Sequence, residues 1–463
     1  QCLVGSEMCI RDSRLTSMTN ETGKGVVSKY SSTYLKNGQK AEEVSTVMDK
    51  NGKSTKKTAA YTYDMLGRIT RETKTGREDI SYTYDANNNR KQMAIGNKTT
   101  AYQYNKNDEL LRTDTLHTDT EKNDVVIYKN DKNGNRLATV NRSEIPAEAK
   151  DTSYIDVDVT LGDNQLNDNV VNHYNALNQL TETLTKNYKV SFTYDAEGLR
   201  TGKTVNGEKT VYVWDGEQVV MELSKGGAVQ KRYIRGNDLV YADKGENTEK
   251  TYYVTDMHGN VVQLLDESGN VTKTYEYDSF GNEVKPEKKD ENPYRYCGEY
   301  YDKETEEVYL RARYYNAENG TFTTEDSDLG TTENPLTRNR YDYTTNNPLN
   351  YSDPTGHSLW SRIKSTAKKA AKAVKSVGKK IVNTAKKVVK TVVNTAKKAA
   401  KTIVNTVKGV AKTAKNAAKH AKQTYQSVKN RVTSSSTYQK ITSRGSQFIR
   451  SVSNGVQLSL IHI

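Results

Sequence analysis

The side chains that most often carry catalysis or bind metal ions are few in this chain and have no recognised catalytic spacing. Its six histidines are scattered, and its three cysteines, Cys2, Cys9 and Cys297, form neither a disulfide framework nor a CxxC pair. The sequence contains no nucleophile elbow, HExxH helix, Walker loop or Rossmann glycine fingerprint. We therefore expect neither a metal site nor a cofactor, and we interpret the histidines as surface or turn residues.

The charge of the chain changes abruptly at residue 357. Residues 358–463 contain 24 Lys and Arg and no Asp or Glu, so the net charge of +13 for the whole chain leaves −11 on residues 1–357. An Asp-Pro-Thr-Gly (DPTG) sequence at 353–356 lies directly before this change. The basic segment is expected to bind anionic partners, namely lipid head groups, nucleic acid or wall polymers.

The composition argues against a thick apolar core for most of the chain. Apolar residues make up 34% of the sequence, and the mean hydropathy is −0.89. The aromatic residues are 32 Tyr but only 4 Phe and 2 Trp, so nearly every large ring carries a polar tip. Tyrosine suits half-buried strands, in which the ring packs and the hydroxyl stays hydrated or hydrogen-bonded. These features favour a β structure over a conventional globular enzyme.

A short motif recurs about every twenty residues, which indicates a repeat architecture. Alternating Tyr and Thr are followed by Asp or Asn, two variable positions, and a Gly or Asn that often precedes Arg. Eight copies occur, at 61–69, 82–90, 102–110, 128–136, 173–180, 192–200, 212–219 and 275–283. The residues that define the motif best are Tyr63, Asp64, Gly67, Tyr84, Asp85, Tyr194, Asp195, Gly198, Tyr277, Asp278 and Gly281.

Each copy predicts a β-hairpin. The alternation of side chains has the period of a strand, which places two rings on one face and the intervening polar residue on the other. The Asp or Asn that follows can bond back to the local backbone, and Gly or Asn accepts a positive φ in the turn. One hairpin is marginal by itself, so the units are expected to stack edge to edge into a continuous ribbon.

These units resemble the YD repeats of the RHS, teneurin and insecticidal toxin-complex proteins. The segment at 252–282 resembles the last repeats before that family's core-associated module, and the segments at 294–327 and 334–357 resemble the module itself. The resemblance implies a mainly β fold. In it, a spiral of hairpins at 14–290 forms a hollow shell, which the core-associated module at 291–357 closes as a plug.

The resemblance also implies one reaction. Members of the RHS family cut themselves just after a DPxG motif by an aspartyl-protease-like mechanism, which here places the cut near His357 and Ser358. Such chemistry needs two carboxyls that share a proton, one to activate water and one to protonate the leaving amine. The family motif assigns these roles to Asp326 and Asp353, with Arg313 as a neighbouring cation.

Two positions depart from the family pattern. Asn316 stands where the family usually has an acid, and His357 stands where it usually has Leu after DPxG. The alternative interpretation is that Asp353 makes a tight turn with Pro354 and that Asp326 caps another turn.

Residues 358–433 are predicted to form a basic amphipathic helix. An eleven-residue repeat, equal to three helical turns, runs from 381 to 424. Apolar residues gather on one face and lysines on the other. The stretch that we expect to bind an anionic membrane is Lys386, Lys387, Val388, Val389 and Lys390. Packing against another helix is one alternative. Nucleic-acid binding is less favoured, because lysines would contact the phosphates and the valine face would remain without a partner.

The two ends differ from the rest of the chain. Residues 1–13 and the last residues of the Ser/Thr-rich linker at 434–463 resemble translated sequencing-adapter read-through. We therefore expect the native ends to be missing, and with them any secretion signal.

Two functions from different classes fit the sequence. In the first, an RHS/YD-repeat carrier encloses its own C-terminal segment and presents it as a toxin or effector in interbacterial or host interaction, with an immunity protein as a further partner. In the second, a cell-surface or wall-binding adhesion protein binds carbohydrate through its Tyr-rich strands. Both predict a secreted or cell-surface protein. Any enzymatic activity would be limited to self-cleavage near His357.

Overall fold

The computed structural model describes residues 5–11, 14–120, 122–143 and 168–357 apart from positions 237, 246, 247 and 288, together with scattered positions between 401 and 423. The chain divides into two compact units, Gln1–Ser365 and Thr366–Ile463. In the second unit, the described positions between 401 and 423 are helical and exposed, and the predicted basic helix at 358–433 stays a prediction. The stretch from Lys386 to Lys390 and the linker at 434–463 lie outside the described residues, so their roles stay predictions.

The described residues of the first unit form one large antiparallel sheet of 23 strands, in which each strand pairs with the next along the chain. The first twelve strands are β1 (Gly5–Arg11), β2 (Arg14–Thr22), β3 (Gly25–Tyr34), β4 (Lys40–Met48), β5 (Ser54–Tyr63), β6 (Ile69–Lys74), β7 (Ile80–Tyr84), β8 (Arg90–Ile95), β9 (Lys98–Tyr104), β10 (Leu110–His117), β11 (Lys122–Asn130) and β12 (Arg136–Ser143). The others are β13 (Val170–Tyr174), β14 (Leu180–Leu184), β15 (Lys189–Tyr194), β16 (Arg200–Val205), β17 (Glu208–Asp215), β18 (Gln218–Ser224), β19 (Val229–Arg235), β20 (Leu239–Asp243), β21 (Thr251–Thr255), β22 (Val261–Leu265) and β23 (Val271–Thr274).

The repeat motif forms the turns of this sheet. In the copy at 61–69, Asp64 Oδ1 accepts hydrogen bonds from the main-chain N–H groups of Leu66 and Arg68, both at 3.0 Å. Gly67 has a φ of +86°, a left-handed conformation that glycine adopts without strain. Tyr63 lies at a register shift directly before the turn. The predicted turn chemistry is therefore the observed one.

The tyrosine before the motif Asp links consecutive repeats in several copies. The hydroxyl of Tyr84 donates to the carbonyl oxygen of Ile69 at 2.7 Å, and the hydroxyl of Tyr194 donates to that of Leu180, also at 2.7 Å. In both pairs the acceptor lies just after the turn of the preceding repeat. Trp214 occupies the same position in its own repeat, and its indole N–H makes the equivalent bond. The excess of tyrosine thus reflects a hydrogen bond between repeats as well as ring packing.

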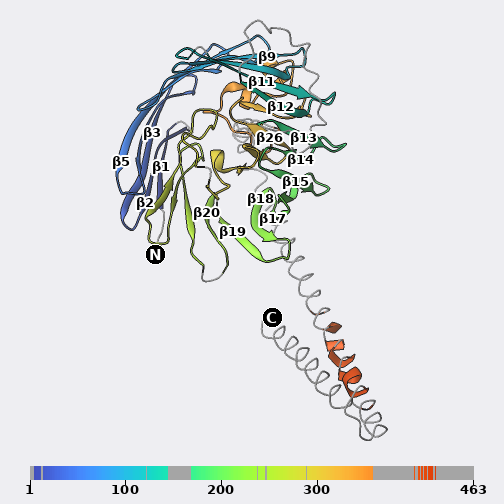
Figure 1. The fold of residues 1–463 in the computed structure, drawn as a ribbon. Coiled ribbons are helices and arrows are strands. Elements are labelled where there is room, and N and C mark those ends of the chain that lie inside the picture. Colours follow the sequence, from blue (N-terminus) through green and yellow to red (C-terminus); the bar gives the residue numbers. More distant parts are fainter. Residues whose placement is uncertain are drawn as a thin grey trace, which may run out of the picture. The chain divides into compact units, whose positions relative to one another are not determined.

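Residues 291–357 lie inside the curve of the sheet (gold to orange in Figure 1). They contain a second antiparallel sheet of β24 (Tyr300–Asp302), β25 (Glu307–Leu310), β26 (Arg313–Asn316) and β27 (Thr321–Phe322), and three short 3-10 helices, η2 (Tyr296–Gly298), η3 (Pro335–Arg338) and η4 (Thr344–Asn346). We call this part the inner module. The described residues of the first unit contain no α-helix, and the mainly β prediction is confirmed.

Buried charges tie the inner module to the sheet. Arg200 of β16 pairs with Asp302 of β24, and neither side chain is more than 1% exposed. Lys203 Nζ lies 2.9 Å from the other carboxylate oxygen of Asp302. The Arg200 guanidinium also lies 4.3–5.9 Å from the ring centres of Phe192, Tyr212, Tyr300, Tyr309 and Tyr314. Removing one partner of such a pair leaves an uncompensated buried charge, so this contact fixes the position of the module.

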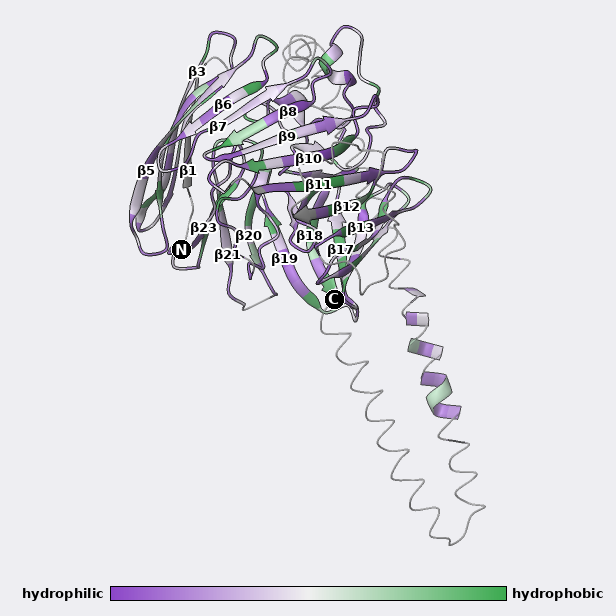
Figure 2. Cartoon of the chain, turned by 45° about the horizontal axis from the view of Figure 1, so that its top comes forward, coloured by the Kyte–Doolittle hydropathy of each residue, from purple (hydrophilic) through white to green (hydrophobic). Residues whose placement is uncertain are grey.

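Strands near the two ends of the ribbon, β2–β4 and β21–β23, meet through side chains. Met18, Val27 and Tyr30 pack in one buried cluster with Val254 and Val262 and their neighbours in β21–β23. Gln263 Nε2 donates to the carbonyl oxygens of Val27 and Met48 at 3.0 and 2.8 Å. Figure 2 shows hydrophobic and hydrophilic residues interspersed along the strands, as expected for a sheet that covers an interior without a thick apolar core.

Candidate active site

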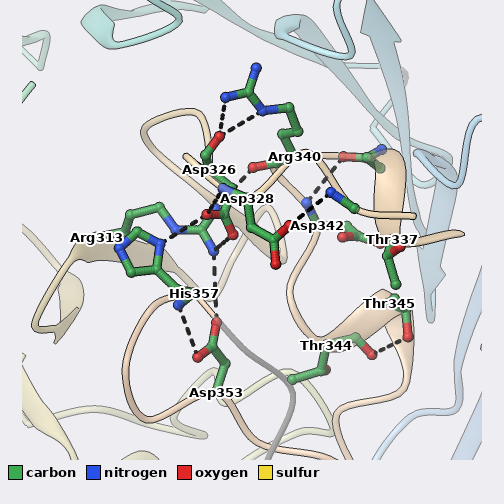
Figure 3. Close-up of a pocket in the computed structure, with 12 residues that line it drawn as sticks. Arg313, Asp326, Asp328, Thr337, Arg340, Asp342, Thr344, Thr345, Asp353 and His357 are labelled. Atoms are coloured by element: carbon green, nitrogen blue, oxygen red, sulfur yellow. Dashed lines mark hydrogen bonds and ion pairs between the residues drawn. The ribbon is translucent and has the colours of Figure 1, made fainter. Parts of the chain in front are cut away.

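A small cavity in the inner module gathers charged residues from four segments of the chain. It has a volume of about 70 Å³, enough for water, and its lining includes Arg313, Asp326, Asp342, Asp353 and His357 (Figure 3). Arg313 is the first residue of β26, and Asp326 follows β27. Asp342 forms an isolated β-bridge with Thr321, and Asp353 and His357 belong to the last described turn. Residues far apart in the sequence therefore share one polar site.

Arg313 lies between two of the carboxyl groups (Figure 3). Its Nη2 is 2.6 Å from Asp326 Oδ2 and 3.7 Å from Asp353 Oδ2. The three residues are buried, with 5%, 8% and 4% of their surfaces exposed. The guanidinium stacks on the ring of Phe322, with its carbon 3.6 Å from the ring centre. A buried cation in this position stabilises negative charge beside it.

The DPTG sequence forms a tight turn. Asp353 Oδ1 accepts hydrogen bonds from the main-chain N–H groups of Gly356, at 2.9 Å, and His357, at 3.2 Å. Arg313 Nε donates to the carbonyl oxygen of Gly356. Gly356 has a φ of +76°, and a Cβ there would lie 2.6 Å from the carbonyl oxygen of Leu310. Asp353 therefore forms the turn, which presents the chain at His357 beside Arg313, and its role in a reaction stays a prediction.

Asp326 is held in its ionised form. Burial raises its pKa, but the hydrogen bond from His357 and the charge of Arg313 outweigh burial, so the pKa lies below its ordinary value. The His357 contact joins Nδ1 to Asp326 Oδ1 at 2.9 Å. The main-chain N–H of Asp328 also donates to Oδ1, at 2.9 Å. An ionised carboxylate that accepts three hydrogen bonds can take a proton from water. It carries no proton of its own that it could share with a second carboxyl.

Asp342 has the opposite environment. Burial raises its pKa well above the ordinary value for an aspartate, and the charge of Arg313 only partly opposes this. The Asn88 side chain, from the turn between β7 and β8, donates a hydrogen bond to Asp342 Oδ2. The environments of the two carboxyls thus move their pKa values in opposite directions.

The comparison with known protein families assigns the fold. The family model described as Teneurin YD-shell matches residues 12–349. The chain belongs to the Teneurin YD-shell family. Arg313, Asp326 and Asp342 lie inside the matched residues, and the turn from Asp353 to His357 lies just beyond them.

Curated relatives of this YD-shell chain include two nucleases of Bacillus. The tRNA3(Ser)-specific nuclease WapA of Bacillus spizizenii is 34% identical over 307 residues, which is 64% of this chain and 12% of that protein. The tRNA nuclease WapA of Bacillus subtilis is 33% identical over the same length and the same shares. The chain therefore spans about an eighth of the length of these relatives.

Solved structures that match this chain include the TcdB2-TccC3-Cdc42 crystal structure, at a TM-score of 0.35 and 16% identity. A structure of TcdB2-TccC3 without the hypervariable C-terminal region matches with a TM-score of 0.34 and the same identity. Both cover 76% of this chain and 21% of the other chain. Separately, no helix within the described residues of this chain is long and apolar enough to cross a membrane.

The site residues expected from the sequence come together only in part in this YD-shell structure. Arg313, Asp326, Asp353 and His357 line one cavity, whereas Ser358 lies outside the described residues. Asn316 is elsewhere: it ends β26, and its Oδ1 accepts the main-chain N–H of Asn319 at 2.9 Å. Its amide therefore forms a turn, and Asn316 is not among the residues that line the cavity.

Sequence reasoning missed Asp342. Its neighbours in the sequence are turn-forming and aromatic residues, and its partner Asn88 is 254 residues away. The sequence shows only that this acid lies within the core-associated module. That observation does not tell whether its side chain faces the cavity or the solvent. Contacts between the module and the sheet decide its environment.

Proposed function

We propose that the chain is the closing part of a YD-shell carrier that holds a C-terminal effector segment and frees it by cutting after the DPTG motif. The observation that carries the proposal is the position of the turn at 353–357. It is held by Arg313 inside the inner module, at the residue where the composition changes to the basic segment 358–463. Family membership supports the carrier role, and the names of the relatives favour an RNA-cleaving effector in a longer protein of the same kind.

We expect the shell around an effector to extend beyond this chain. One cavity of about 560 Å³ is lined from both ends of the sheet, including Lys40 and Glu43 of β4 and Thr274 of β23. That volume suits a drug-sized ligand and not a segment as long as 358–463. The chain spans about an eighth of the length of its relatives, and we propose that a longer protein supplies the rest of the shell. This chain's share is to close the shell and to hold the segment that is cut.

The proposed cut is hydrolysis of the peptide bond between His357 and Ser358. A carboxylate takes a proton from water, the water oxygen attacks the carbonyl carbon of His357, and the leaving amine gains a proton. Asp326 fits the role of base because Arg313 and His357 keep it ionised. Asp353 holds the turn that places the bond at the site.

Substitution of the two aspartates tests this proposal. Asp326→Asn removes the base, and Asp353→Asn weakens the turn that presents the bond, so each should leave the chain whole. Asp328→Asn is the matched control, because its carboxyl lines the same cavity but bonds only to the main-chain N–H of Gly330 among the described residues. Denaturing gels measure the cut, and thermal unfolding shows that each variant folds. Cleavage of Asp326→Asn at the wild-type rate would contradict the assignment.

The described residues do not favour the adhesion alternative. Stacking on sugars requires exposed rings, but the hydroxyls of the motif tyrosines Tyr63, Tyr84, Tyr194 and Tyr277 donate to main-chain carbonyls of the preceding repeats. We therefore propose the carrier and not the carbohydrate-binding function.

A further inference from the structure

The cavity of about 560 Å³ is separate from the site that holds the DPTG turn. It is lined by residues of β3–β6, by the turn after β6 and by residues between 256 and 287, and it shares no lining residue with the smaller cavity. Its volume lies in the range of small-molecule binding sites. The proposed cut gives this cavity no role.

Three cations gather at one part of the lining. Lys57 Nζ of β5 is 2.6 Å from Glu276 Oε2, and Lys74 Nζ of β6 is 3.0 Å from Glu276 Oε1. Arg77 Nη1, in the turn after β6, is 3.8 Å from Glu276 and 3.6 Å from Glu72. We call Lys57, Lys74 and Arg77 the cationic cluster. Within the described residues, these are the only two carboxyls within 4.0 Å of it, so at least one positive charge stays uncompensated at the cavity.

The other carboxyls of the lining are engaged elsewhere. Asp49, Asp256 and Asp278 accept main-chain N–H groups of their own turns, and Glu43 and Glu287 pair with lysines outside the cluster. Glu72 offsets the cluster only in part, because burial and the nearby charge of Asp278 raise its pKa. An anion that enters the cavity therefore meets its positive charge at the cationic cluster.

Two buried polar atoms of the lining have no hydrogen-bond partner among the described residues. One is the hydroxyl of Tyr30, a residue that is 3% exposed. The other is Nε2 of His258. Burial and the charge of Lys40 lower the pKa of His258 to about 4, so its imidazole is neutral at pH 7. Buried polar atoms are nearly always hydrogen-bonded, and a polar group bound in the cavity would supply the missing partners.

From these contacts we propose that the cavity binds a phosphate monoester of a small polar molecule. The phosphate group lies at the cationic cluster, because its three outer oxygens suit two ammonium groups and a guanidinium better than the two oxygens of a carboxylate do. The uncharged part of the ligand forms hydrogen bonds with Tyr30 and His258. This inference does not depend on the proposed cut.

Isothermal titration of the full chain with ribose 5-phosphate at low salt tests the proposal. Inorganic phosphate and ribose are the matched compounds, since each contains only one part of the probe. We expect ribose 5-phosphate to bind on the order of tenfold more tightly than phosphate, because only the ester reaches Tyr30 and His258. Ribose alone should not bind, and added salt should weaken the binding of both phosphate compounds.

Substitution of single lysines assigns the binding to this cavity. Lys57→Gln and Lys74→Gln each remove one charge of the cluster but leave Glu276 paired with the other lysine, so each variant should fold and should bind on the order of tenfold more weakly. Lys56→Gln is the matched control, because Lys56 is the exposed neighbour on β5 and does not line the cavity. The basic segment 358–463 is the same in every variant, so it does not contribute to the differences.

Glu276→Gln should have the opposite effect. Its carboxylate competes with the ligand for the cationic cluster, so its removal should strengthen binding, whereas mere damage to the structure would weaken it. Tyr30→Phe should narrow the difference in affinity between ribose 5-phosphate and phosphate.

Three results would overturn the proposal or one of its parts. The absence of binding by both phosphate compounds, or equal binding by Lys57→Gln and Lys56→Gln, overturns the site itself. Ribose that binds as tightly as ribose 5-phosphate overturns the assignment of the phosphate group. Equal affinities for ribose 5-phosphate and inorganic phosphate overturn the roles of Tyr30 and His258.

Discussion

The hydroxyl of the motif tyrosine does more than its sequence pattern predicts. The alternation of Tyr and Thr predicts a ring on one face of a strand, which is observed. It does not identify the acceptor of the hydroxyl, since that carbonyl belongs to the preceding repeat and depends on how neighbouring hairpins align. Tyr84 and Ile69 are one such pair.

Tyr84→Phe should lower the free energy of unfolding by about 1–2 kcal/mol, because it removes a hydrogen bond and leaves the Ile69 carbonyl without its partner. Tyr82→Phe is the matched control on the same strand. The Tyr82 hydroxyl is buried and has no partner among the described residues, so its loss should not destabilise the protein. Urea unfolding of the two variants measures the difference. Equal destabilisation by both would show that ring packing alone explains the motif tyrosine.

Glu307 of β25 provides a second test at the scale of one residue. Burial raises the pKa of Glu307 to about 8, and Arg136 opposes this only partly. Because the folded-state pKa exceeds the unfolded value of about 4.3, the folded protein binds an extra proton between these values. This contribution to stability is fully present below pH ~4.3 and is lost as the pH rises through about 8.

Glu307→Gln should therefore gain stability relative to the wild type as the pH rises. Between pH 5 and pH 9 the difference in unfolding free energy should shift by more than about 1 kcal/mol in favour of the variant, since one pKa unit corresponds to about 1.4 kcal/mol. Urea unfolding at both pH values measures it. A difference that does not depend on pH would mean that Glu307 is ionised in the folded protein.

At the scale of elements, the hairpins could be predicted and several connections could not. The geometry of the turn at Asp64 and Gly67 depends only on nearby residues, so this hairpin can be predicted from the sequence. The pairing of β12 with β13 joins residues on either side of positions 144–167, where no repeat motif indicates a partner. Likewise, β1 pairs with β2, and no copy of the repeat motif within Gly5–Arg11 indicates this pairing.

The basic tail remains a prediction at this scale. Residues 360–430 should be poorly helical in dilute buffer and become helical on anionic vesicles, because the apolar face is too narrow to stabilise a helix without lipid burial. Circular dichroism of the full chain, with neutral vesicles as the control, measures the gain in helix. A gain that is equal on neutral and anionic vesicles and insensitive to salt would exclude electrostatic binding.

At the scale of the whole molecule, the inner module and the sheet depend on each other. Arg200 is a motif residue of the sheet, yet its buried partner Asp302 belongs to the module. Asn88, also in a sheet turn, bonds to Asp342 in the candidate site. The sequence motifs predict each part separately. These contacts join residues about a hundred or more positions apart, and they depend on how the ribbon curves. No local sequence pattern encodes that curvature. The contacts place the candidate site where the chain leaves the module.

The central claim is that the chain cuts itself after His357. Denaturing mass spectrometry of the expressed full chain tests this claim directly. The account predicts two pieces, one ending at His357 and one beginning at Ser358. A single uncut chain of 463 residues would contradict the account.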